Sequence, residues 1–180
     1  MAAFRKIRKP GKDEYPGYSH IYMDLLKDDD LILDQLHENF FKINEFIYSL
    51  PVEKLIYRYA ENKWTIKEIL AHLIDDERIY AYRALRFARN DRTELPGFEQ
   101  DNYALESRAN IRTIESLLKE FAAVRRSTIA LFDSFDGEVL TRSGVASGNV
   151  MSVRAAVYHI AGHELRHINI IKERYLTASP

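Results

Sequence analysis

Four long helical stretches, separated by glycine- and proline-containing breaks, constrain this 180-residue chain most strongly. We predict helices over about 28–50, 65–90, 107–135 and 152–176, because strand-like alternation of apolar and polar residues is scarce between the breaks. Four helices of this length favour an all-α four-helix bundle. A long loop, with the sequence "DRTELPGFEQDNYAL", is expected between the second and third helices.

Capping residues set the expected ends of these helices. Thr65 and Glu68 have the spacing of a capping box, in which each side chain satisfies a free backbone N–H of the first turn. The aspartates at 28–30 are expected to cap the first helix, and Pro51 to stop it. Ser152 is expected to start the last helix.

The N-terminal segment differs from the rest of the chain. Residues 1–27 contain two proline–glycine breaks and a basic start, "FRKIRKPGK". We therefore predict an irregular N-terminal arm over 1–27, with its basic start solvated, and one bundle domain over 28–180.

Composition excludes several classes of function. With 26 basic and 27 acidic residues, the net charge of −1 offers no general attraction for nucleic acid or an anionic membrane. No run approaches the roughly 18 apolar residues of a membrane span, and no signal peptide is evident. A cytoplasmic protein is expected. The chain has no cysteine, which excludes disulfides, thiolate ligands and a cysteine nucleophile.

Three of the six histidines lie four residues apart in the predicted last helix: His159, His163 and His167. Side chains at this spacing lie one turn apart on the same side, so two imidazoles can bind one metal ion. His163 and His167 lie nearest the apolar stripe, whereas His159 is expected furthest from it. Ordinary helix histidines are the alternative. His20 and His37 lack partners at ligand spacing and are expected to be surface or packing residues.

The third ligand is expected from the second helix. His72 flanks an apolar stripe there, and metal sites in bundles are built from facing helices. Three imidazoles leave one coordination position open, as catalytic metal sites require. The expected cofactor is a divalent transition metal. Zinc and nickel suit imidazole best, with manganese as a further option.

The sequence "HELRH" at 163–167 also matches the H-E-x-x-H motif of zinc peptidases. That function needs a third ligand and a glutamate beside the metal. Only 13 residues follow His167, with Glu173 as the sole ordinary ligand candidate among them. No strand is evident to align a peptide. The sequence therefore favours a metal site with an upstream third ligand over a small metallopeptidase.

Two glutamates, Glu77 and Glu164, interrupt apolar stripes. A buried carboxylate needs a partner, so each is expected to bond to a tyrosine or arginine. Alternatively, one accepts a hydrogen bond from a ligand imidazole or acts as a general base. Asp76, one turn after His72, competes for that role. Glu164 and Asp76 are therefore the candidate catalytic carboxylates.

Two side chains of the long loop are also candidates. Asp101 and Tyr103 can either reach over the metal site or anchor the loop to the bundle. The sequence leaves both readings open.

Three segments resemble the DinB-like (YfiT-type) superfamily of four-helix metal proteins: "YRYAENKWTIKEILAHLIDDERIYAYRALRFARND", "LPGFEQDNYA" and "SVRAAVYHIAGHELRHINIIKERYL". The resemblance extends from about residue 30 to the C-terminus. It implies a three-histidine site, placed on His72, His163 and His167. Many members carry a further histidine just before the last ligand, where this chain has Arg166.

The resemblance also bears on function. Some relatives are transferases or isomerases that use low-molecular-weight thiols, and many are assigned only as metal-dependent hydrolases. We expect a metal-dependent hydrolase or thiol S-transferase that activates water or a thiol cosubstrate against a small electrophile. A non-catalytic metal-binding or stress-response protein is the alternative. A homodimer is expected, because relatives often pair and the chain holds 11 tyrosines and 9 phenylalanines.

Overall fold

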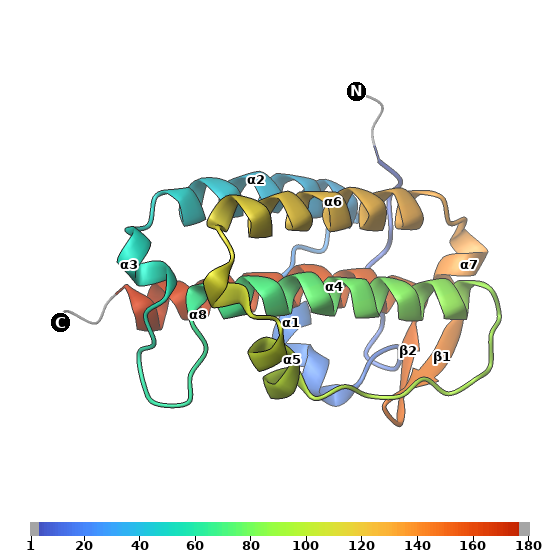
Figure 1. Cartoon of the computed structure of the whole chain (residues 1–180). Helices are drawn as coiled ribbons and strands as arrows, with labels where there is room; N and C mark the ends of the chain where they lie inside the picture. The colour runs from blue at the N-terminus through green and yellow to red at the C-terminus, as the bar shows by residue number, and fades with distance from the viewer. Residues whose placement is uncertain (1–3, 177–180) are drawn as a thin grey trace.

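Four long helices lie side by side in the computed structural model, which describes residues 4–176 (Figure 1). They are α2 (Ile32–Tyr48), α4 (Ile66–Ala88), α6 (Ile114–Asp133) and α8 (Val153–Ile170). Helix α4 packs against α6 and α8, and α2 packs against the same two helices. Each helix therefore has two neighbours, and the predicted four-helix bundle is confirmed.

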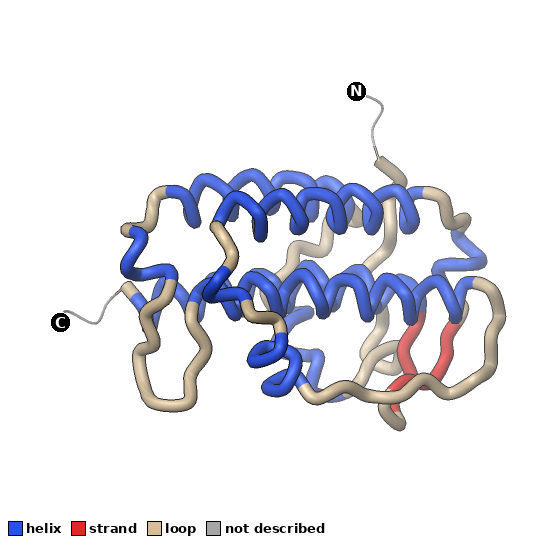
Figure 2. The backbone as a smooth tube through the Cα atoms, viewed as in Figure 1, coloured by secondary structure: helices blue, strands red, loops and turns tan. Residues whose placement is uncertain are grey.

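Shorter elements connect and extend these helices (Figure 2). They are η1 (Gly17–Ser19), α1 (His20–Met23), α3 (Val52–Leu55), α5 (Gln100–Glu106), η2 (Ala109–Ile111), α7 (Gly137–Thr141), β1 (Ser143–Ala146), β2 (Asn149–Ser152) and the π-helical turn η3 (Ile171–Tyr175). No helix within residues 4–176 is long and apolar enough to cross a membrane.

Local capping explains where α4 and α8 begin. The Thr65 side chain accepts a hydrogen bond from the Glu68 N–H, and Glu68 accepts one from the Thr65 N–H, so the predicted capping box is confirmed. Ser152 likewise caps α8 by accepting from the Ala155 N–H. The predicted aspartate caps of α2 are wrong. Leu31 occupies the N-cap position without a side-chain bond, and the Asp29 carboxylate instead accepts a hydrogen bond from the Leu31 N–H at 3.0 Å.

The third long helix starts later than predicted. It begins at Ile114, because Thr113 caps it and Arg108 adopts a left-handed backbone with φ of 51°. The segment from 100 to 111 instead forms α5 and η2, so the predicted long loop is partly helical.

A β-hairpin precedes α8, although no strand was evident in the sequence. Strands β1 and β2 pair antiparallel, with Ser143 opposite Ser152 and Ala146 opposite Asn149. Ser147 and Gly148 turn the chain with φ of 52° and 72°. Four-residue strands leave too short an alternation to be recognised from sequence.

The N-terminal segment packs onto the bundle, so the prediction that its basic start is solvated is wrong for the buried Ile7 and Pro10. Ile7 is fully buried, and its carbonyl accepts a hydrogen bond from the Tyr158 hydroxyl at 2.7 Å. Helix α1 crosses α8 closely at Gly162, where a Cβ atom would collide with the Tyr22 carbonyl. The absence of a side chain at Gly162 therefore permits this packing.

The core contains two large apolar clusters separated by a buried polar layer, and one small cluster of three residues. One large cluster includes Leu36, Tyr80 and Ile160, and the other includes Ile43 and Ile168. The polar layer lies at intermediate positions along the same helices, and its buried residues are His72, Asp76, Glu77, Arg125, His159, His163 and Glu164.

Candidate metal centre

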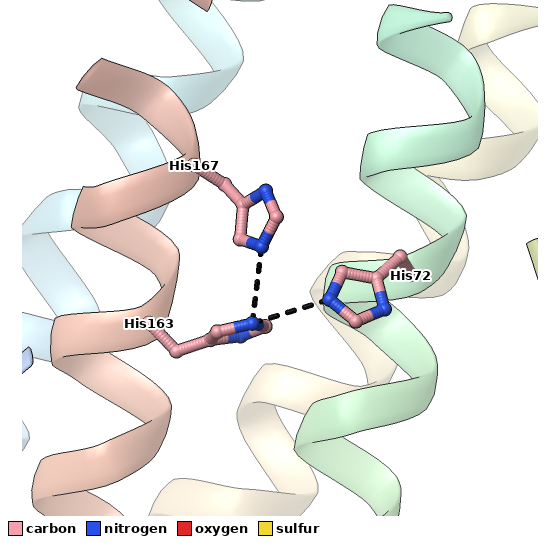
Figure 3. Close-up of side chains that lie close together, drawn as sticks. All are labelled: His72, His163 and His167. Carbon is pink, nitrogen blue, oxygen red and sulfur yellow. Dashed lines mark hydrogen bonds between the residues drawn. The ribbon is translucent and has the colours of Figure 1, made fainter. Parts of the chain in front are cut away.

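Three histidines predicted as ligands meet between α4 and α8 (Figure 3). The Nε2 atom of His163 lies 3.1 Å from Nε2 of His72 and 3.1 Å from Nε2 of His167. His72 and His163 are buried, and His167 is half-buried. The four-residue spacing in α8 aligns His163 with His167, and the packing of α4 against α8 adds His72.

The geometry of this triad fits a metal ion. A neutral imidazole nitrogen either donates one proton or accepts at one lone pair, so hydrogen bonds cannot satisfy both contacts of His163 Nε2 well. Tetrahedral metal–nitrogen bonds of about 2.0–2.1 Å set ligand nitrogens about 3.3 Å apart, close to the spacing here. The three nitrogens can therefore hold a divalent transition metal.

Burial favours the neutral, metal-binding form of two of these histidines. Burial, followed by the charge of His163, lowers the pKa of His72 to about 4. The same two causes lower the pKa of His167 to about 2. Both rings are therefore neutral at pH 7, as metal ligands must be.

Asp76 contacts the opposite face of the triad. Its Oδ2 lies 3.2 Å from Nδ1 of His163, so it accepts the ring proton that is not needed for metal binding. Burial opposes ionisation of Asp76, but the charge and hydrogen bond of His163 outweigh it and hold its pKa well below the ordinary range. A carboxylate in this position fixes the imidazole tautomer and orientation. The structure thus gives Asp76 a positioning contact.

His159 is placed differently from the prediction. It was expected furthest from the core, yet it is only 3% exposed, because η1 and α1 cover this face of α8. Its ring stacks on Tyr80 with centroids 3.8 Å apart, and its Nε2 lies 3.7 Å from Asp76 Oδ2. Asp76, His159 and Nδ1 of His163 form a second group with metal-binding side chains.

The catalytic role predicted for Glu164 stays a prediction, and the structure shows what its carboxylate contacts. Its carboxylate forms an ion pair with Arg125, which also binds Glu77 through Nε and Nη2 at 2.9–3.2 Å. The alternative that both glutamates pair with a tyrosine or arginine is therefore confirmed. Since the peptidase motif requires its glutamate beside the metal, "HELRH" does not build that site here. The β-hairpin lies near the C-terminal end of α4 (Figure 1), whereas His72 lies in the second turn of that helix.

The comparison with a family of known proteins decides the classification. The family model described as the DinB superfamily matches residues 35–171. The chain belongs to the DinB superfamily.

Two individual proteins are similar to this DinB-superfamily chain. A protein of Oceanobacillus iheyensis, named as a proposed metal-dependent hydrolase, is 28% identical over 133 residues, which are 73% of this chain and 76% of that protein. The structure of YfiT from Bacillus subtilis has a TM-score of 0.73 at 14% identity, covering 95% of this chain and 94% of YfiT. YfiT is described as a proposed metal-dependent hydrolase with an unusual four-helix bundle topology. This structural likeness supports the fold.

The two candidate residues of the long loop, Asp101 and Tyr103, have different surroundings in the structure. Asp101 lines a cavity together with His167, and its negative charge raises the pKa of His72 against the larger effect of burial. Tyr103 does not line this cavity and instead contacts the Phe98 ring at 5.2 Å between centroids. His20 is exposed beside Asp24, and His37 packs between Phe4 and Phe41, as expected of surface or packing residues.

Sequence reasoning missed Arg125 and most of the cavity. Arg125 interrupts the apolar stripe of α6 between Phe121 and Ile129, the same signal that identified the two glutamates. The cavity residues Tyr59 and Lys63 come from an irregular segment, where periodicity carries no information.

Proposed function

We propose that this protein is a metal-dependent enzyme in which His72, His163 and His167 hold one divalent transition metal. The observation that carries the proposal is the convergence of three Nε2 atoms. That of His163 lies 3.1 Å from that of His72 and 3.1 Å from that of His167. Within residues 4–176, no fourth histidine, aspartate, glutamate or cysteine joins this group. The names of the two similar proteins agree with a metal-dependent reaction.

His72, His163 and His167 would hold the metal as neutral imidazoles, so that its charge would be uncompensated and would strongly acidify a bound water or thiol. Neighbouring side chains position the ligand imidazoles. Asp76 holds His163 in one tautomer, and Trp64 packs against His72 with ring centroids 4.6 Å apart. The proposed reaction is attack on a small electrophile, as a hydrolase or an S-transferase. Because the chain has no cysteine, any thiol must arrive as a cosubstrate.

The finer expectations remain proposals. We propose zinc or nickel, with manganese as the third choice, and a cytoplasmic homodimer that binds neither nucleic acid nor membranes. The alternative is a metal-binding protein without turnover. An ion that only stabilises the bundle would be expected to have four protein ligands. Because the triad supplies three ligands and leaves one coordination position open, it favours the enzyme.

Metal analysis of untagged protein tests the ligand set. We expect about one divalent metal per chain by mass spectrometry of the intact protein, as one three-ligand centre holds one ion. His163→Ala and the double variant His72→Ala/His163→Ala should lose the metal. His37→Ala should retain it, because His37 packs against the rings of Phe4 and Phe41 and is not part of the triad. Undiminished metal in the double variant would show that the ligand set is wrong.

A turnover screen separates the enzyme from the binding protein. Hydrolysable esters and amides, and thiols paired with small electrophiles, are offered to the metal-loaded protein. Activity should disappear with chelator and return with zinc, nickel or manganese. Turnover that survives complete metal removal contradicts the mechanism, whereas metal binding without any turnover favours the alternative.

A further inference from the structure

A cavity of about 270 Å³ adjoins the proposed metal centre. Its lining includes His167, and it is smaller than the roughly 300–1,000 Å³ typical of ligand pockets, so it suits a small molecule. Three aromatic side chains from separate positions contribute walls, namely Tyr59, Trp64 and Tyr175. The Trp64 ring is nearly parallel to that of His167, at 14° and 6.2 Å between centroids. The cavity thus continues from the triad along aromatic surfaces.

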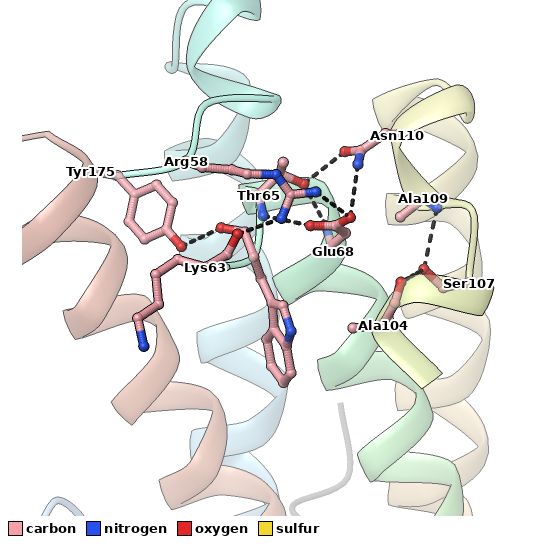
Figure 4. A network of polar contacts seen from close by, with 10 residues as sticks. Arg58, Lys63, Thr65, Glu68, Ala104, Ser107, Ala109, Asn110 and Tyr175 are labelled. Atoms are coloured by element: carbon pink, nitrogen blue, oxygen red, sulfur yellow. Dashed lines mark hydrogen bonds and ion pairs between the residues drawn. The ribbon is translucent and has the colours of Figure 1, made fainter. Parts of the chain in front are cut away.

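The segment that carries Lys63 and Trp64 is held at both backbone carbonyls (Figure 4). The Arg58 guanidinium donates to the Lys63 carbonyl and to Glu68 Oε1, and the Tyr175 hydroxyl donates to the Trp64 carbonyl at 2.5 Å. Glu68 is itself fixed by the capping box of α4. The part of the cavity formed by Lys63 and Trp64 is therefore preorganised, which lowers the entropic cost of binding a ligand.

Two charged side chains line the cavity, Lys63 and Asp101. Both are exposed, and no described residue forms a hydrogen bond or ion pair with the Lys63 ammonium or the Asp101 carboxylate. Because Asp101 lines the cavity at a distinct position from Lys63, its negative charge disfavours an anionic group beside it and favours one at Lys63. A divalent metal on the triad would make the net charge of the site positive.

We propose that this cavity binds a small organic anion with a flat apolar body, held by Lys63 at its carboxylate and by Trp64 at its ring. This inference names the substrate class of the proposed enzyme and rests on that proposed function. The carboxylate lies at Lys63, and the remainder of the molecule extends along the aromatic walls towards His167. Asp101 then faces a neutral or protonated polar group of the ligand.

Trp64 is the only tryptophan of the chain, so its fluorescence reports on this cavity. Zinc-loaded protein is titrated with phenylacetate, with the neutral isostere phenylacetamide and with acetate, which lacks the ring. Phenylacetate should change the Trp64 emission in a saturable manner. The other two probes should bind at least tenfold more weakly, because each lacks one of the two recognised features.

Variants assign the contact. Lys63→Met should weaken phenylacetate binding at least tenfold without changing the zinc content. Lys119→Met is the matched control, since Lys119 is also exposed and without a partner among the described residues, but lies on α6 outside the cavity. The control should bind as the wild type does.

The outcomes distinguish the two proposals. Zinc content is measured on every sample, and a wild type without zinc refutes the proposed function alone. Phenylacetate binding by the wild type and by Lys63→Met is measured again after the zinc has been removed with a chelator. The tenfold ratio of the two affinities should persist. Equal binding of phenylacetamide, unchanged affinity in Lys63→Met, or no saturable emission change refutes the anion site even if zinc is bound.

Discussion

At the scale of single residues, His163 is the centre of the site because both of its ring nitrogens are used. Nε2 faces His72 and His167, while Nδ1 faces Asp76 at 3.2 Å. A carboxylate on the second nitrogen makes a metal-bound imidazole more basic and fixes its orientation. Asp76 therefore acts on the proposed metal through His163.

Replacing Asp76 with asparagine tests this contact. Asp76→Asn keeps the shape of the side chain but removes its charge, so zinc affinity should fall about 10- to 100-fold while the fold is retained. Competition with a chromophoric chelator measures the affinity, and circular dichroism checks the helices. Asp75→Asn, a change at the half-buried partner of Arg78, is the control and should leave affinity unchanged. Equal affinity in both variants would contradict the role of Asp76.

At the scale of elements, one arginine joins all four long helices. Arg125 lies on α6, binds Glu77 of α4 and Glu164 of α8, and donates to the Leu36 carbonyl of α2 at 2.7 Å. Burial raises the pKa of Glu164 although the ion pair opposes this. An uncompensated buried carboxylate is costly, so this network determines how the helices align.

Removing the arginine should therefore destabilise the bundle more than a typical substitution does. We expect Arg125→Met to lower the free energy of unfolding by about 3–5 kcal/mol, because two buried carboxylates lose their partner. Chemical denaturation measures the change. Adding Glu77→Gln and Glu164→Gln should recover most of the loss, and Arg126→Met, at the exposed neighbour, should have little effect. Full stability of Arg125→Met would refute this account.

At the scale of the whole molecule, a polar layer separates the two large apolar clusters of the core. Burial lowers the pKa of His72 to about 4 and that of His159 to about 3. In the unfolded chain these histidines titrate near 6.5. Between the folded-state pKa of His72 and the unfolded value near 6.5, the unfolded state therefore binds more protons than the folded state does. The free energy of unfolding must then rise with pH in that range.

Metal-free protein should accordingly be sensitive to mild acid. The contribution of the neutral histidines is fully present above about pH 6.5, and it is lost as the pH falls from there towards the folded-state pKa of about 4 for His72. Thermal unfolding in chelator between pH 7.5 and 5 should show a falling Tm. The double variant His72→Ala/His159→Ala should show a smaller slope. A Tm that is independent of pH in the wild type would contradict the burial of neutral imidazoles.

Much of the fold was predictable because its signals are local. The Thr65–Glu68 capping box and the Ser152 cap depend on residues within one turn, and they start α4 and α8 where expected. The four-residue spacing of His163 and His167 places both on one side of a helix in any context. The bundle and the approach of His72 follow from apolar stripes that require facing helices.

Other features were decided by contacts between distant segments. His159 is buried because η1 and α1 cover α8, and Glu164 faces Arg125 because α6 packs beside α4 and α2. The cavity beside His167 combines an irregular segment, α5 and the end of α8. The sequence by itself determined the helices and the residue types available to a metal. Only the tertiary structure decided which carboxylate meets which partner, because the partner of a buried charge is chosen by packing across the chain.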